Sequence, residues 1–258
     1  MKRIILAALF ALGLNGPALA GITQITGSGT GGAIGTANAA AGGTTVVVTT
    51  NVAVPPGSLI AIALGVRTAG SYSGCTDSAG NTYATPLNKT TTGQTTSTTY
   101  SYTTVNLPSG GTITCTSPNT SNKGMIAAAF SATDSSPLDA ASATPTNGSG
   151  TTISVGPTGT LACPSVSGNC ELLFAAWSDL GIGTITEDAN FTNLGTQTGN
   201  SGNTHAAFKL VTANTAVSYS AGNTTSNNWA AYLQAFKAAT GGGGPTLQGG
   251  TLLRGAGR

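Results

Sequence analysis

The sequence predicts an all-β protein, an antiparallel β-sandwich, and three observations lead to that prediction. Short apolar or β-branched runs alternate with clusters of Gly, Asn, Ser, Thr and Pro, which is typical of sandwiches and barrels. Helical periodicity is nearly absent. Charged residues make up only 6% of the 258 residues, against about 25% in ordinary soluble domains, so the surface is expected to consist mainly of hydroxyl and amide side chains.

The expected strands follow one another with turn residues between them. The run 96–105 alternates Tyr100 and Tyr102 with Thr, which is the period of a half-buried strand. The last run, 229–237, could equally be a helix, because its alanines favour helix, but the repeat described next favours a strand. In order, the expected strands are 44–50, 58–66, 96–105, 111–117, 125–131, 151–155, 171–177, 204–211, 216–220 and 229–237.

A degenerate internal duplication predicts two related halves, about 44–135 and 151–239. The segment 111–130 lines up with 215–233, and both contain Asn-Thr followed by Ser or Thr before an apolar run. Neither half is expected to have enough strands to enclose its own core. The prediction is therefore one sandwich domain over 44–239, within the size range of all-β domains.

The two ends differ from this body. Residues 1–20 indicate a secretory signal peptide, with Lys2 and Arg3, an apolar stretch and an Ala18-Leu19-Ala20 cleavage site. The apolar stretch is shorter than the roughly 20 residues that span a bilayer, so no stable membrane span is expected after cleavage. Residues 21–43 are expected to be a Gly-rich lead-in, and 240–258 a flexible Gly-rich tail. An extracellular or cell-surface location is predicted, with the periplasm as the alternative.

Charge excludes some partners and favours others. Cleavage would remove two of the nine basic residues and leave seven basic and seven acidic ones. The basic residues are scattered, so neither nucleic acid nor an anionic membrane surface is expected as a partner. A near-zero net charge favours association, and hydroxyl-rich strands can pair at exposed edges. A homo-oligomer or surface assembly is therefore expected.

The four cysteines, Cys75, Cys115, Cys163 and Cys170, form an even set in a chain with an export signal, which favours disulfides. Three connectivities are open, and we favour Cys75 with Cys115 and Cys163 with Cys170. A zinc site is the alternative, but the spacing does not match the usual pairs and the chain has one histidine. No metal or other cofactor is expected.

Motifs for catalysis are weak. The G-x-G-x-x-G pattern at 27–32 lacks the preceding strand and following helix of a dinucleotide site, so a linker is expected there. The sole histidine, His205, lies in a strand-like run without a G-x-S-x-G motif, which favours an ordinary strand histidine. Asp134 and Asp139 leave a secreted hydrolase open, although aspartates in such connections commonly cap turns. A conventional enzyme is not expected.

The most specific local feature is Asp77-Ser-Ala-Gly80-Asn81-Thr-Tyr83. It predicts a turn in which Asp77 accepts backbone N–H groups and Gly80 and Asn81 adopt positive φ. Calcium would need six to eight oxygen ligands, and this segment offers two side chains. Aromatic residues could stack on a sugar ring, although most are expected to fill the core. The candidates for stacking are Tyr72, Tyr100, Trp177 and Trp229.

Several motifs occur in a fixed order: the apolar strand 56–66, D-S-A-G-N-T-Y at 77–83, G-T-I-T-C-T at 111–116, F-S-A-T-D-S-S-P-L-D at 130–139 and W-A-A-Y-L-Q-A-F-K at 229–237. In this order they resemble a loosely defined group of bacterial and phage-associated secreted β-sandwich proteins, over residues 44–239. The resemblance implies an immunoglobulin-like or jelly-roll sandwich of exported surface proteins or of virion and tail components. It brings no catalytic residues, and the signal peptide departs from what a virion protein requires.

Together these expectations favour a non-enzymatic, exported structural or adhesive surface protein that self-assembles. A carbohydrate-binding module with a glycan ligand is one alternative, and a phage virion or tail component is another. A secreted hydrolase is the least favoured.

Overall fold

The computed structural model describes residues 21–68, 70–118, 121–161, 163, 168–181, 183–199 and 202–239. The expected signal peptide, 1–20, and the expected tail, 240–258, lie outside these residues. Within the described ranges every regular element is a β-strand except one 3₁₀ turn, η1 (Thr30–Gly32). The all-β prediction is confirmed, and the segment 229–237 is part of a strand rather than a helix.

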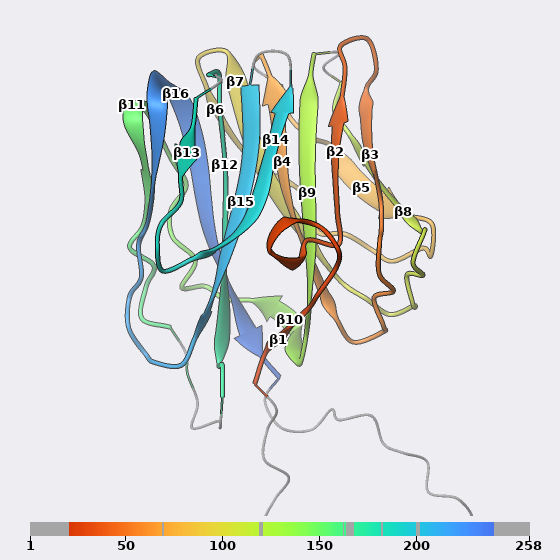
Figure 1. Ribbon diagram of the computed structural model, residues 1–258. Helices are drawn as coiled ribbons and strands as arrows, with labels where there is room; N and C mark the ends of the chain where they lie inside the picture. Colours follow the sequence, from red (N-terminus) through yellow and green to blue (C-terminus); the bar gives the residue numbers. More distant parts are fainter. Residues whose placement is uncertain are drawn as a thin grey trace, which may run out of the picture.

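The strands form three antiparallel sheets (Figure 1). The six-stranded sheet contains β1 (Thr23–Ile25), β2 (Gly35–Ala39), β4 (Leu59–Arg67), β6 (Leu87–Thr91), β7 (Gln94–Tyr102) and β9 (Lys123–Ser131). The seven-stranded sheet contains β10 (Thr133–Leu138), β11 (Thr146–Val155), β12 (Glu171–Asp179), β13 (Ile185–Thr186), β14 (Thr192–Gly199), β15 (Gly202–Val211) and β16 (Tyr219–Ala238). The three-stranded sheet contains β3 (Thr45–Thr49), β5 (Gly74–Asp77) and β8 (Thr112–Thr116).

The strand β16 belongs to two layers. Its C-terminal half, from Trp229, pairs with β12, whereas its beginning pairs with the end of β11 and with β13. The register between β11 and β16 shifts between Gly150 and Thr152, where Gly150 takes a φ of 122°. In Figure 1 the β11–β16–β13 part of the seven-stranded sheet lies on the left and the three-stranded sheet on the right, with β12, β15, β4 and β9 between them.

The two halves of the chain repeat one pairing scheme. In the first half β9 pairs with β1, β2 and β4, β4 pairs with β7, β7 with β6, and β8 lies between β3 and β5. In the second half β16 takes the place of β8 and β9, and β11 takes the place of β2 and β3. The strands β12, β15, β14, β13 and β10 then correspond to β4, β7, β6, β5 and β1. The repeated scheme spans 23–131 and 133–238.

Three clusters of buried apolar side chains lie between successive layers. The central cluster joins the six- and seven-stranded sheets and contains Phe130, Phe174 and Phe236. A second cluster lies between the six- and three-stranded sheets, and a third lies beneath the outer part of β16. The expectation that neither half encloses a core is therefore wrong. Each half has a hydrophobic cluster of its own, and the two halves together form the central cluster. β4 and β9 are buried on both faces, which explains their apolar runs without alternation.

The strand β7 is also largely buried, yet it consists of Thr and Ser over much of its length. The hydroxyls of Thr96 and Thr98 are hydrogen-bonded across the central interface, whereas those of Ser97, Thr99 and Ser101 bond to residues 82–88 of the same half. Thr96 Oγ1 bonds to Ser178 Oγ and to the carbonyl oxygen of Ala230 (2.8 Å), and Thr98 Oγ1 donates to Gln234 Oε1 (2.6 Å). Because an unpaired buried hydroxyl costs free energy, these bonds favour one relative position of the two sheets.

The Gly-rich segment 27–32 is folded rather than a linker, which corrects the expectation for 21–43. Gly31 takes a φ of 59°, and a Cβ added there would overlap the carbonyl of Asn193 in β14. Position 31 therefore requires glycine for two reasons: the Asn193 backbone lies too close for a side chain, and the positive φ is unfavourable for other residues. The strands on either side of this segment, β1 and β2, both pair with β9. Strands β5, β6, β10, β13 and β14 were also not predicted from the sequence.

Candidate functional site

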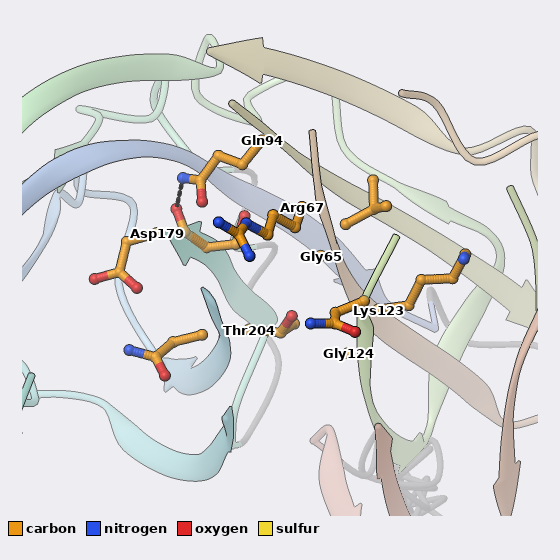
Figure 2. A pocket seen from close by; sticks show the side chains of 11 residues that line it. Gly65, Arg67, Gln94, Lys123, Gly124, Asp179 and Thr204 are labelled. Carbon is orange, nitrogen blue, oxygen red and sulfur yellow. Dashed lines mark hydrogen bonds between the residues drawn. The ribbon is translucent and has the colours of Figure 1, made fainter. Parts of the chain in front are cut away.

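A cleft opens at one end of the central sandwich, where β4, β7 and β9 meet β12 and β15 (Figure 2). It holds about 290 Å³ of empty space, part of it open to solvent. Most of its lining residues carry polar side chains, although apolar atoms form the larger part of the exposed lining, and Arg67 contributes one exposed guanidinium. The lining residues are Gly65, Val66, Arg67, Gln94, Asn122, Lys123, Gly124, Ser178, Asp179, Asn203 and Thr204.

Two glycines bring the sheets together at the floor of the cleft. A Cβ added to Gly65 or to Gly124 would overlap Thr204 Oγ1. The second basic residue of the cleft, Lys123, is turned away from it, because its ammonium donates to the carbonyls of Gly43 (2.6 Å) and Ser121 (2.9 Å). Burial lowers the pKa of Lys123. The cleft therefore offers amides, hydroxyls and one cation to a ligand.

Asp179 ends β12 at the cleft but directs its carboxylate away from Gly65 and Thr204 (Figure 2). It is 1% exposed, and its Oδ2 accepts a hydrogen bond from Asn223 Nδ2. Its cross-strand neighbour Asn203 also lies against the carboxylate with its side chain and backbone N–H, and Oδ1 of Asn203 is buried without a hydrogen-bond partner. Burial raises the pKa of Asp179 to about 6, although hydrogen bonds from Asn223, Asn203 and Gly181 lower it in part.

His205 takes part in a buried network on the outer side of the seven-stranded sheet. Its Nε2 pairs with Glu187 Oε2, and its Nδ1 lies 2.7 Å from Thr196 Oγ1. The Trp177 ring lies against the imidazole, with 4.9 Å between ring centroids, and its Nε1 donates to the Tyr219 hydroxyl (2.9 Å). The His205 side chain is 0% exposed. The sequence predicted an ordinary strand histidine, and the structure places His205 in β15, where it is buried with a carboxylate and a hydroxyl.

The Asp77 segment forms a tight, fully bonded turn. Asp77 Oδ1 accepts from the backbone N–H groups of Ala79 (2.9 Å) and Asn81 (3.0 Å), and Oδ2 accepts from Asn81 Nδ2 (3.0 Å) and Tyr83 Oη (3.1 Å). Gly80 takes a φ of 84°, whereas Asn81 is not among the residues with positive φ. Burial, with the Asp77 charge, raises the pKa of Tyr83. The carboxylate oxygens are thus occupied by protein donors.

The candidate stacking rings are packed inside the protein. Tyr72, Trp177 and Trp229 are 2%, 0% and 7% exposed, and the Tyr72 hydroxyl donates to the carbonyl of Gly65 (2.9 Å). Tyr100 is half-buried and meets Phe236 edge to face, with 5.3 Å between centroids. For Tyr72, Trp177 and Trp229 the stacking assignment is therefore corrected, because these rings could receive a sugar only by leaving the cores, whereas for Tyr100 it stays a prediction.

Other acidic side chains also accept nearby backbone N–H groups, Asp139 in a turn and Asp134 within β10. Asp134 Oδ1 accepts from Ser136 N (2.8 Å), and Asp139 Oδ1 accepts from Ala141 N (2.7 Å). Burial alone would raise the pKa of Asp188, but N–H donors from Asn190 and Ser220 outweigh it and lower that pKa. In the described part of the chain no three acidic, histidine or cysteine side chains converge as a metal site would require.

The cysteines form two disulfides, Cys75–Cys115 and Cys163–Cys170, which are the pairs that the sequence favoured. Disulfides of this kind are compatible with an extracellular or periplasmic protein. In the part of the chain that the structure describes, no helix is long and apolar enough to span a membrane.

The outer face of the three-stranded sheet presents an array of small β-branched side chains, which we call the threonine face. Cross-strand partners on this face are Thr45 with Thr116, Val47 with Thr114, and Thr49 with Thr112, and Thr114 also faces Thr76. Val47 is 45% exposed, whereas its neighbours Val46 and Val48 point into the core. The threonine face consists of Thr45, Val47, Thr49, Thr76, Thr112, Thr114 and Thr116 and carries no charge.

Sequence reasoning identified the Asp77 turn and the disulfides but missed the cleft, the Asp179 group and the threonine face. Asp179, Asn203 and Asn223 come from three strands far apart in the chain, so no local pattern could bring them together. Comparisons of the chain with models of known protein families, with curated proteins and with solved structures gave no match.

Proposed function

We propose that this protein is an exported, non-enzymatic structural or adhesive surface protein that assembles with copies of itself through the threonine face. The observation that carries the proposal is the uncharged, β-branched outer face of the three-stranded sheet, in which Val47, Thr45, Thr49, Thr76 and Thr116 are exposed and Thr112 and Thr114 are partly exposed.

Low charge supports association through this face. With seven acidic and nine basic residues in 258, copies repel one another weakly. Threonine offers a methyl group for contact and a hydroxyl that can donate and accept, so two such faces can meet without burying an unpaired charge. The Cys75–Cys115 disulfide joins β5 to β8 directly beneath the face and holds its two strands in register.

The remaining polar chemistry supports a structural role. Asp77, Asp139 and Asp188 accept backbone N–H groups within turns, and Asp134 accepts one within β10. The β7 hydroxyls connect the two large sheets. These side chains are thus used to hold the fold.

The test is the solution mass of the oxidised protein by light scattering over a wide concentration range. We expect multimers that dissociate on dilution. Thr114→Lys places a charge in the middle of the threonine face and is expected to weaken assembly at least tenfold. Thr152→Lys adds the same charge at an exposed position in the other half and is the matched control. A protein that stays monomeric at high concentration and does not attach to surfaces would disprove the proposal, as would equal effects of the two variants.

A further inference from the structure

The rim of the cleft carries three polar side chains on neighbouring strands. Arg67 ends β4, and its cross-strand partner on β7 is Gln94. On the other side, the backbone N–H of Arg67 donates to the carbonyl of Asn122 (3.0 Å), the residue before β9. Side chains of directly opposed residues lie on one face of a sheet, and all three line the cleft. Arg67 is therefore the middle member of a row in which two amides flank a guanidinium.

Among the described residues of the lining, Arg67 is the one charged group that is free to meet a ligand. Its side chain is exposed and forms no ion pair with any described residue. The Lys123 ammonium is held by two backbone carbonyls, and the Asp179 carboxylate is turned away and accepts from Asn223 (Figure 2). Because a guanidinium does not lose its charge in proteins, the cleft is suited to a ligand with one negative group.

The other groups of the lining are suited to the hydroxyls and the C–H groups of a sugar. Gln94 donates with its NH₂ group to the carbonyls of Ser178 and Asn228, so its Oε1 is left to accept. The Asn122 side chain and the Thr204 hydroxyl form no hydrogen bond with the described residues and can both donate and accept. Apolar atoms form the larger part of the exposed lining, and such atoms can pack against the C–H groups of a sugar ring.

The cleft is small, and its rim is fixed. Its empty space of about 290 Å³ is at the lower end of the range for small-molecule sites, so it suits one sugar unit. Thr68, next to Arg67, takes a φ of 74°, which is unfavourable for a β-branched residue. Its N–H donates to the carbonyl of Gly93, and its Oγ1 lies 3.0 Å from Ser121 Oγ. Backbone strain of this kind is concentrated at functional sites, and here it holds the end of β4 that carries the guanidinium.

We propose that the cleft binds an acidic sugar. The Arg67 guanidinium pairs with its carboxylate or sulfate group, for which two parallel hydrogen bonds are the usual geometry, and the amides of Gln94 and Asn122 bind its hydroxyls. A neutral sugar lacks the first interaction, and a simple carboxylate lacks the second. The cleft lies between the two large sheets, separate from the threonine face, so this binding does not depend on self-assembly. It gives an exported protein a means of attachment to acidic polysaccharides.

NMR titration of the oxidised full-length chain tests the proposal. The probes are glucuronate and glucose 6-sulfate, which differ in the acidic group, and glucose and acetate serve as references. We expect the better of the two acidic sugars to bind at least tenfold more tightly than either reference and to shift the amide signals of Gly65, Gly124 and Thr204. Arg67→Gln should weaken that binding at least tenfold, because a charge-assisted pair is lost. Lys89→Gln removes a cation from β6 of the same sheet, outside the cleft, and should change nothing.

Several results would overturn the proposal. They are the absence of binding by both acidic sugars, equal affinity for glucose or for acetate, and equal affinity in Arg67→Gln. Shifts confined to signals outside the cleft would do the same. If Arg67→Gln does not fold, the Arg67 Hε signal of the wild type decides, and an unchanged signal at saturating glucuronate refutes the site. Light scattering of the same samples keeps the two proposals apart, because Thr114→Lys should weaken assembly and leave sugar binding intact.

Discussion

Breaking the Cys75–Cys115 disulfide should lower the free energy of unfolding more than breaking the other bridge. The two cysteines are cross-strand partners in β5 and β8, 40 residues apart in sequence, and Cys115 is fully buried. On the chain-entropy model, a disulfide that closes a loop of that length raises the free energy of unfolding by about 4 kcal/mol. The Cys163–Cys170 bridge spans 7 residues and should contribute about 2.4 kcal/mol.

Urea unfolding of two double variants separates these contributions. In Cys163→Ala/Cys170→Ala only the long loop can be reduced, and reductant should lower the unfolding free energy by about 4 kcal/mol. In Cys75→Ala/Cys115→Ala only the short loop remains, and the loss should be about 2.4 kcal/mol. Comparison of oxidised and reduced forms of the same variant cancels the effect of the alanines. A loss below about 1 kcal/mol for the long loop, or a larger loss for the short one, would refute the chain-entropy reasoning.

Two further substitutions test the packing and the turn, both by urea unfolding. Gly65→Ala should cost about 1 to 3 kcal/mol through overpacking against Thr204 Oγ1, and most of that cost should disappear in a Thr204→Ala background; an undiminished cost would mean that the contact is not the cause. Asp77→Ala should cost about 2 to 3 kcal/mol, because it removes the acceptor of four hydrogen bonds. Asp77→Asn should recover part of this, and equal losses would contradict the assigned bonds.

The sequence predicts best where the determinants are local. The Asp77 turn depends on residues within six positions of one another, and long apolar strands such as β4 and β12 are evident from composition. Strand β13 has two residues and β5 has four, too few to show a period. The buried threonines of β7 have the composition of a surface strand. Their burial is explained only by their hydrogen bonds, from Thr96 and Thr98 to the opposite sheet and from Thr95 and Thr99 to residues of the same half.

The candidate site was harder to predict because its parts meet only in the folded chain. Asp179 and Asn203 come from β12 and β15, and Asn223, which donates to Asp179, comes from the start of β16. The Gly-rich segment before β2 shows a different difficulty. Its composition suits a linker, yet Gly31 is glycine because the backbone of β14 passes so close to it.

The repeated pairing scheme places two similar units in one polypeptide, with the central core as the contact between them. If the same units were separate molecules, that contact would form only above a certain concentration. Within one chain it forms at any dilution. Covalent linkage also frees the units to differ: one carries the uncharged threonine face, and the other carries the buried His205–Glu187 pair. Two copies of a single unit would have to carry both features twice.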